Sequence, residues 1–287
     1  MTKPLCPPPN RVVRAPAFMP PANSCDCHVH VIGPQNIYPL SPDAPVAMED
    51  STLDDLEAAH DALGIGRAII VASMAHGFDY QALVHILCSK PDRYRGVVNL
   101  APDITDRELE FLASAGVTGA RFGPGNPPQP NLLARIAEIG WSANLLMPGE
   151  TVFDAWSSLF GDFGGKLVLE HCGLPDPAQG AEGSHFRKIL HLLEGGQCWI
   201  KLSSRFSKSP MPPWEDTLPL IRTLVAFRPD RMVYGSDYPH PNYPGDMPNE
   251  ADFLDALLLW TRSEEERERI LVHNPAELFG FPEAAYG

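Results

Sequence analysis

Short apolar runs alternate with longer amphipathic segments along most of the chain. Runs rich in β-branched and other apolar residues, bounded by Gly, Pro or polar residues, are typical of buried strands. They predict strands in the stretches 25–34, 68–72, 96–100, 119–122, 144–147, 166–171, 198–202 and 232–237. Apolar residues at helical spacing between these runs predict helices at 51–64, 79–89, 106–115, 131–139, 152–160, 184–193, 214–227, 250–260, 264–272 and 276–279.

This alternation predicts an α/β protein with a parallel sheet. The strands are apolar almost throughout, which suits a sheet buried on both faces. Eight strand-helix units in 287 residues favour a closed (β/α)8 TIM barrel over an open sheet. Residues 1–22 are rich in Pro and carry little pattern. We therefore expect an N-terminal arm over 1–22 and a single barrel domain over 23–287.

Composition narrows the range of partners. The formal net charge is −14, so we expect the protein to bind neither nucleic acid nor an anionic membrane. No apolar run is long enough to cross a bilayer, and the N-terminus has no signal-peptide core. The six cysteines form no C-x-x-C pair, which favours reduced thiols and a cytoplasmic location. The oligomeric state stays open, because the arm can cover its own domain or a neighbour.

Candidate chemistry concentrates at the predicted carboxyl ends of the strands, where such barrels place their active sites. In a strand, residues two apart share a face, so His28 and His30 project together. A lone His-X-His motif is more often structural than functional. The remaining strand ends change that balance, because they add further polar residues: Arg121, His171, Arg205 and Asp237.

These residue types suit the hydrolysis of an ester. Asp237 can take a proton from water as a general base, while His28, His30 and His171 stabilise an oxyanion as hydrogen-bond donors or through a metal. Arg121 can bind a substrate carboxylate. Arg205 has the same predicted role, and for both arginines the alternative is a structural salt bridge.

Several segments resemble the amidohydrolase superfamily, in the branch that contains 2-pyrone-4,6-dicarboxylate hydrolase and related lactonases. The resemblance extends from about Pro20 to Phe281. It rests on the segments 26–30 (DCHVH), 39–42 (PLSP), 119–122 (GARF), 170–176 (EHCGLPD), 201–203 (KLS) and 234–240 (YGSDYPH). It implies a TIM barrel that hydrolyses a cyclic ester with the aspartate of the eighth strand, Asp237, as base.

The metal requirement is a separate question. His28, His30, His171 and Asp237 make a plausible mononuclear zinc set. Metal-dependent relatives usually carry a further histidine on the fifth strand, where this chain has only apolar residues. The resemblance implies that this branch works without a metal, so no cofactor is expected to be required, although zinc binding is compatible with the sequence.

Departures from the branch bear on the substrate. Where the dicarboxylate hydrolase carries additional Arg and Tyr residues, this chain has Val46, Met147 and Leu174. We therefore expect a substrate with one carboxylate, or a differently substituted lactone.

Weaker candidates surround the main set. His76 and His240 are candidate substrate-binding residues, each with a loop role as the alternative. Tyr38 and Tyr238 are candidates for the pocket wall. Asp26 is a candidate for orienting the site from behind. The remaining histidines are interpreted as structural or surface residues: His60, His85, His185 and His191.

The sequence therefore predicts a hydrolase that opens a lactone or pyrone-like ester of a small carboxylate in aromatic or sugar-acid catabolism. A mononuclear zinc decarboxylase or hydratase of an aromatic acid is the alternative, because that class shares the His-X-His, His and Asp positions. A barrel that binds a small acid without catalysis is a third option, disfavoured by the presence of all four candidate catalytic side chains.

Overall fold

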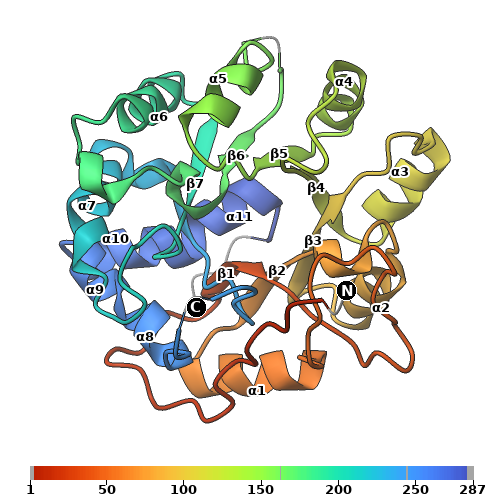
Figure 1. The fold of residues 1–287 in the computed structure, drawn as a ribbon, viewed down its shortest axis with the longest axis horizontal. Coiled ribbons are helices and arrows are strands. Elements are labelled where there is room, and N and C mark those ends of the chain that lie inside the picture. Colours follow the sequence, from red (N-terminus) through yellow and green to blue (C-terminus); the bar gives the residue numbers. More distant parts are fainter. Residues whose placement is uncertain (1–2, 162, 244, 283–287) are drawn as a thin grey trace.

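Eight parallel strands form one sheet in sequence order, β1 to β8 (Figure 1). The computed structural model describes residues 3–161, 163–243 and 245–282. The strands are β1 (Cys25–Val29), β2 (Arg67–Val71), β3 (Tyr94–Asn99), β4 (Val117–Phe122), β5 (Ser142–Leu145), β6 (Leu167–Leu169), β7 (Cys198–Leu202) and β8 (Met232–Tyr234). All seven neighbouring pairs of this order are parallel.

The sheet closes on itself just beyond the ends of β1 and β8. Val29 and Tyr238 form a parallel bridge, and the His30 N–H donates to the Tyr238 carbonyl at 2.7 Å. The Asp237 N–H donates to the His28 carbonyl at 2.9 Å. The predicted (β/α)8 barrel is confirmed. The same backbone bonds place Asp237 beside the two histidines of the first strand.

Helices follow the strands on the outside of the barrel (Figure 1). They are α1 (Leu53–Leu63), α2 (Gln81–Ser89), α3 (Asp106–Ser114), α4 (Pro130–Glu138), α5 (Glu150–Ser157), α6 (Ser184–Glu194), α7 (Leu218–Phe227), α8 (Glu250–Asp255), α9 (Leu257–Trp260), α10 (Glu264–Glu268) and α11 (Asn274–Phe279). The segment predicted as one helix at 250–260 is two, and the segment at 264–272 ends in a π-helical turn over Arg269–His273. Apolar periodicity alone does not resolve such breaks.

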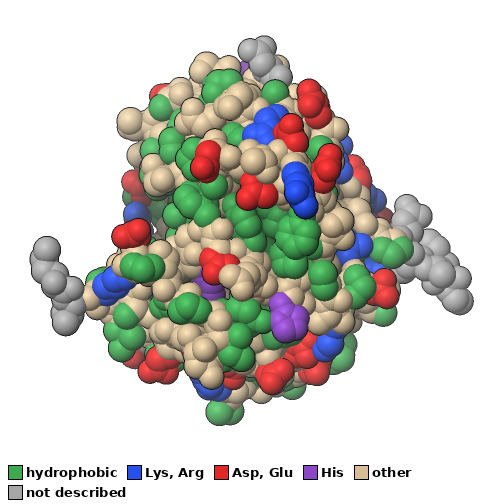
Figure 2. Space-filling model, turned by 90° about the vertical axis from the view of Figure 1, so that its right-hand side faces the viewer, with side chains coloured by type: hydrophobic (Ala, Val, Ile, Leu, Met, Phe, Trp, Pro, Cys, Tyr) green, Lys and Arg blue, Asp and Glu red, His purple; other side chains and the backbone are tan. Residues whose placement is uncertain are grey.

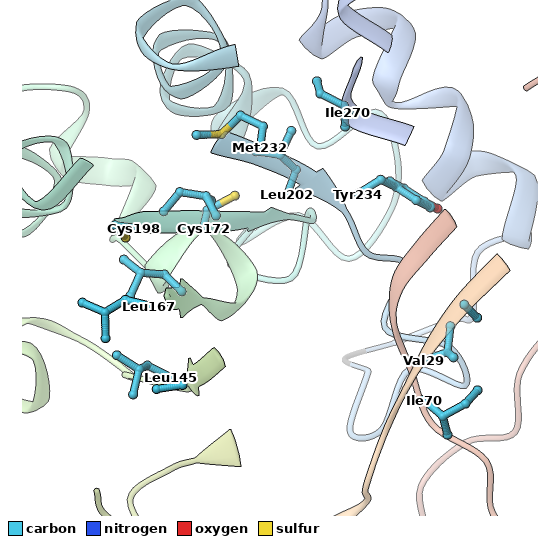
Figure 3. Packing of buried hydrophobic residues seen from close by; sticks show 14 of the residues in the cluster. Val29, Ile70, Leu145, Leu167, Cys172, Cys198, Leu202, Met232, Tyr234 and Ile270 are labelled. Atoms are coloured by element: carbon cyan, nitrogen blue, oxygen red, sulfur yellow. The ribbon is translucent and has the colours of Figure 1, made fainter. Parts of the chain in front are cut away.

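Two apolar layers hold the barrel together. The larger lies between strands and helices; Figure 3 shows members such as Val29, Ile70 and Leu202, which come from different strands. The smaller fills the barrel interior and includes Cys25 and Cys27, which are fully buried. These two cysteines pack as small apolar residues.

The N-terminal segment crosses the surface of its own chain. Arg14 pairs with Asp252 at 2.6 Å and with Asp255 at 2.8 Å, both on α8. Arg11 pairs with Asp55 of α1 at 3.1 Å. The segment therefore lies across α1 and α8, two helices that contact each other on the outside of the barrel. Within the described residues, no helix has the length and hydropathy that a membrane span requires.

Candidate active site

Three imidazole rings converge on one carboxylate at the mouth of the barrel. Nε2 of His28, His30 and His171 lie 3.5, 3.6 and 3.8 Å from the same oxygen, Oδ1 of Asp237. The four side chains are nearly buried. The structure thus brings together the four residues that the sequence assigned to catalysis.

Each ring is held from behind through its Nδ1 atom. His30 Nδ1 lies 2.8 Å from the Val71 carbonyl at the end of β2. His171 Nδ1 lies 3.0 Å from the hydroxyl of Ser203, just after β7. Because these contacts fix the ring planes, all three Nε2 atoms face the same point, which is the preorganisation that a catalytic site requires.

Two of the four residues have an unusual backbone. His171 and Asp237 have φ angles of 52° and 76°, in the left-handed region that side-chain-bearing residues seldom adopt. Both residues follow the end of a strand rather than lying in it, since β6 ends at Leu169 and β8 at Tyr234. Backbone strain of this kind clusters at functional sites, where the surrounding structure holds it.

A cavity of about 520 Å³ opens above this cluster. It is large enough for a small ring, and one wall is apolar. Its lining includes three of the four catalytic candidates and both predicted arginines: His30, Arg121, His171, Arg205 and Asp237, with Pro45, Val46, Met48, Leu146, Pro148 and Leu174 among the apolar residues. His28 is not among the lining residues; its Nε2 is buried behind Asp237. Met147 is fully buried and Leu146 lines the cavity in its place.

The two arginines differ in how many N–H groups they have left for a ligand. Arg121 donates through Nε and Nη2 to Oε2 of Glu170, at 3.0 and 2.9 Å. Arg205 places Nε 3.3 Å from Oδ2 of Asp237 and donates through Nη1 and Nη2 to the carbonyls of Asn242 and Pro241. Of the five N–H groups on a guanidinium, Arg121 keeps three and Arg205 two.

Glu170 and Lys201 lie directly beneath the histidines and were not assigned a role from the sequence. Glu170 is fully buried and Lys201 is 1% exposed. Lys201 Nζ lies 3.3 Å from His28 Nδ1 and 3.8 Å from Glu170 Oε1. A lysine in the otherwise apolar strand 198–202 was the available signal, because lysine is almost never fully buried without a partner.

Among the weaker candidates, the two histidines lie away from the cavity lining. His240 is 1% exposed, and its Nε2 lies 3.0 Å from both carboxylate oxygens of Glu250. It stacks on Phe253, with ring centroids 4.1 Å apart. His76 is also buried, within the turn Met74–His76. Both substrate-binding assignments therefore stay predictions that this geometry does not favour.

Asp26 acts on backbone groups rather than on a histidine ring of the site. Its Oδ1 accepts from the N–H groups of His28 and Ser236, at 3.2 and 2.9 Å. Its Oδ2 lies 3.5 Å from His60 Nε2. Asp26 thus joins the end of β8 to β1 and fixes the relative position of the catalytic residues that follow.

The two tyrosines proposed as pocket wall also lie elsewhere. Tyr38 hydrogen-bonds through its hydroxyl to His85 Nδ1 and lines a separate groove with Phe78 and Phe111. These two phenylalanines are exposed. Figure 2 shows the α3 side of the molecule, where hydrophobic side chains lie among polar and charged ones. Tyr238 is 3% exposed and is absent from the lining of the catalytic cavity.

Burial and neighbouring charge set the protonation of the cluster. Burial lowers the pKa of His171 to about 4, against the opposing pull of Asp237 and Glu170. Burial, helped by Lys201, also lowers the pKa of His28 well below its usual value. Burial alone would raise the pKa of Asp237, but His171, His30 and Arg205 outweigh it, so this pKa lies well below the ordinary range. At neutral pH the site thus holds an ionised base beside neutral His28 and His171.

We expect these shifts to appear in the pH dependence of kcat/KM. Asp237 stays ionised and His171 stays neutral as the pH falls, because both pKa values are lowered. The rate should therefore be level from about pH 8 down to about pH 5 and fall near pH 4. A pH profile of kcat/KM checks this. An acid limb near the ordinary histidine value of about 6.5 would contradict it.

His28, His30 and Asp237 offer donor atoms of the types that zinc binds, and these atoms lie within 4.8 Å of one another. His171 adds a nitrogen 3.8 Å from Asp237 Oδ1. Donors about 2.0 to 2.2 Å from a tetrahedral zinc lie about 3.3 to 3.6 Å from one another. The three Nε2 atoms lie 3.5 to 3.8 Å from Asp237 Oδ1. Nε2 of His28 is buried without a hydrogen-bond partner in the described part of the chain. The site can therefore hold one zinc ion after small adjustments.

Comparison with known proteins agrees with this geometry. A family model described as Amidohydrolase matches residues 25–281. A 4-sulfomuconolactone hydrolase of Hydrogenophaga intermedia is 32% identical, over 96% of this chain and 95% of its own. A 2-pyrone-4,6-dicarboxylate hydrolase of Comamonas testosteroni is 31% identical, over 92% of each. A solved structure of a putative 2-pyrone-4,6-dicarboxylic acid hydrolase from Pseudomonas putida superposes with a TM-score of 0.80 at 26% identity, and covers 92% of this chain and all of that one.

Proposed function

Because the chain belongs to the amidohydrolase family, we propose that it hydrolyses the ring ester of a lactone or pyrone-like carboxylate in aromatic or sugar-acid catabolism. The convergence of His28, His30 and His171 on Asp237 carries this proposal. Two relatives that cover more than nine-tenths of this chain are named as hydrolases, of 4-sulfomuconolactone and of 2-pyrone-4,6-dicarboxylate.

The residues of the site divide the reaction between them. Arg121 binds the substrate carboxylate through its remaining N–H groups, and the histidines hold the ring carbonyl oxygen. Asp237 removes a proton from water as the water oxygen bonds to the carbonyl carbon. The ring C–O bond then breaks, and the proton moves to the departing oxygen or to solvent. Arg205 keeps Asp237 oriented through its Nε contact.

We propose that no metal is required for this reaction. Asp237 already has its pKa lowered and stays ionised without one. Where zinc is bound, His28, His30, His171 and Asp237 would hold it, and it would polarise the carbonyl and lower the pKa of a water molecule. The alternative function, a mononuclear zinc decarboxylase or hydratase of an aromatic acid, would use the same residues, of which His28, His30 and Asp237 lie at metal-binding spacing.

The cavity favours a substrate with one carboxylate. Val46 and Leu174 form apolar wall, and Arg121 is the arginine with most of its N–H groups available. A second carboxylate would face these apolar side chains, because Arg205 is already engaged by Asp237 and two carbonyls, and burial of an unpaired charge is costly. A muconolactone with one carboxylate is thus a better fit than a pyrone dicarboxylate.

A panel of lactones tests this proposal. Ring opening is followed by proton release, with the enzyme divided into chelator-treated and zinc-supplemented samples. We expect turnover in the chelated sample, with monocarboxylate lactones preferred to the pyrone dicarboxylate. Carbon dioxide release from aromatic acids, dependent on zinc, would instead establish the alternative function. Efficient turnover of the dicarboxylate would contradict the substrate preference alone.

The cellular location and the binding partners of the protein are also part of the proposal. We propose a cytoplasmic location, supported by six free cysteines, of which five are buried. The partner is a small lactone carboxylate, and the acidic surface supports the expectation of no nucleic-acid or membrane binding.

A further inference from the structure

Lys201 is an ammonium group buried beneath the catalytic histidines. It lies on β7, is 1% exposed and is packed inside the barrel. Its Nζ lies within hydrogen-bond distance of one ring nitrogen, His28 Nδ1, at 3.3 Å. Glu170 Oε1, at 3.8 Å, supplies the opposing charge. A buried lysine is uncommon without a specific task, so its effect on His28 is informative.

The chemistry of this contact fixes the position of a proton. A lysine ammonium has three donors and no acceptor, so His28 Nδ1 must accept from it. A neutral imidazole that accepts at Nδ1 carries its proton on Nε2. The alternative partner for Nδ1 is Glu170 Oε1, but at 3.6 Å it lies beyond hydrogen-bond distance. The contacts around His28 therefore favour the tautomer with Nε2–H.

His30 has the opposite arrangement. Its Nδ1 lies 2.8 Å from the Val71 carbonyl, which can only accept, so Nδ1 carries the proton. The two histidines of one motif are thus held differently at Nδ1: His28 faces a donor there and His30 an acceptor. His171 faces the Ser203 hydroxyl, which can donate or accept.

We propose that Lys201 is a positioning residue that fixes the Nε2–H tautomer of His28, so that His28 presents a hydrogen-bond donor to Oδ1 of Asp237, 3.5 Å away. This inference rests on the proposed hydrolysis for its catalytic meaning. It also has a consequence for zinc, because a zinc ligand must present an unprotonated nitrogen. Lys201 therefore weakens zinc binding at a site whose spacing otherwise suits the ion.

Nitrogen NMR of histidine-labelled, chelator-treated enzyme tests the tautomer directly. The His28 signals are assigned by their loss in His28→Gln. We expect a proton on Nε2 and none on Nδ1 in the unmodified protein. A proton on Nδ1 of His28 would overturn the proposal, whatever the enzyme hydrolyses. The measurement needs no substrate, so failure of the proposed function leaves this result intact.

Substitution of Lys201 provides a second, independent test. Lys201→Met removes the donor, so the proton is expected to move to Nδ1 and the zinc affinity to rise by about tenfold or more. With a lactone substrate, kcat should fall while KM changes little. Lys201→Arg keeps a donor-only group and should keep the Nε2–H tautomer.

Lys188→Met, an exposed lysine on α6 remote from the site, is the matched control and should change neither property. An unchanged tautomer and unchanged zinc affinity in a folded Lys201→Met protein would overturn the proposal. If that variant does not fold, the NMR signals of the unmodified protein decide the question alone.

Discussion

Replacing Asp237 with Asn is expected to lower kcat for lactone hydrolysis by about 10²- to 10⁴-fold. The amide keeps the size of the side chain but cannot accept a proton from water. In the proposed reaction the substrate is bound mainly by Arg121 and the cavity wall, so KM should change only a few-fold. Steady-state kinetics of the two proteins, after chelation, provide the measurement.

A matched control separates the loss of the base from the loss of a negative charge. Asp106→Asn removes an exposed carboxylate at the start of α3, where it pairs with Arg135. This variant should retain full activity. A value of kcat within tenfold of the unmodified enzyme for Asp237→Asn would exclude Asp237 as the general base.

Replacing Glu170 with Gln is expected to lower the free energy of unfolding by about 3 to 5 kcal/mol. Glu170 is fully buried and is the carboxylate that faces both Arg121 and Lys201, at 2.9 and 3.8 Å. The substitution leaves two buried cations beside a neutral amide. Urea unfolding followed by circular dichroism at neutral pH provides the measurement.

The control for this prediction is an ion pair at the surface. Glu182→Gln breaks the pair between Glu182 and Arg187, whose side chains are both exposed. Exposed pairs contribute little, so stability should stay within the error of the measurement. A loss for Glu170→Gln as small as that of the control would show that the buried network does not need its carboxylate.

The barrel could be predicted because each strand is buried on both faces, so its sequence is a nearly continuous run of apolar residues. The ends of those runs located the catalytic cluster, since parallel strands in a barrel carry their site at one rim. His28 and Asp237 are far apart in sequence, yet each follows the same rule. Two strands were predicted to extend two or three residues too far, to His171 and Asp237, because these residues adopt positive φ angles and do not continue the strand.

The residues behind the site were harder to predict. His240 and Tyr38 lie close to site motifs in sequence, but their side chains turn towards Glu250 and His85. Periodicity says which face a residue occupies in a regular element, whereas in a loop the direction is set by tertiary partners. For Glu170 and Lys201 the sequence shows charged residues in or next to apolar strands, which marks them as unusual. Which histidine ring each contacts could not be predicted, because it depends on packing across three strands.

The position of oxygen atoms after one turnover in H₂¹⁸O tests the central claim most directly. The account has water, activated by Asp237, attack the ring carbonyl. A single turnover should therefore place one ¹⁸O atom in the newly formed carboxylate of the product and none in Asp237. An unlabelled product with ¹⁸O in the Asp237 carboxylate would contradict it, because that result would make Asp237 the nucleophile rather than the base.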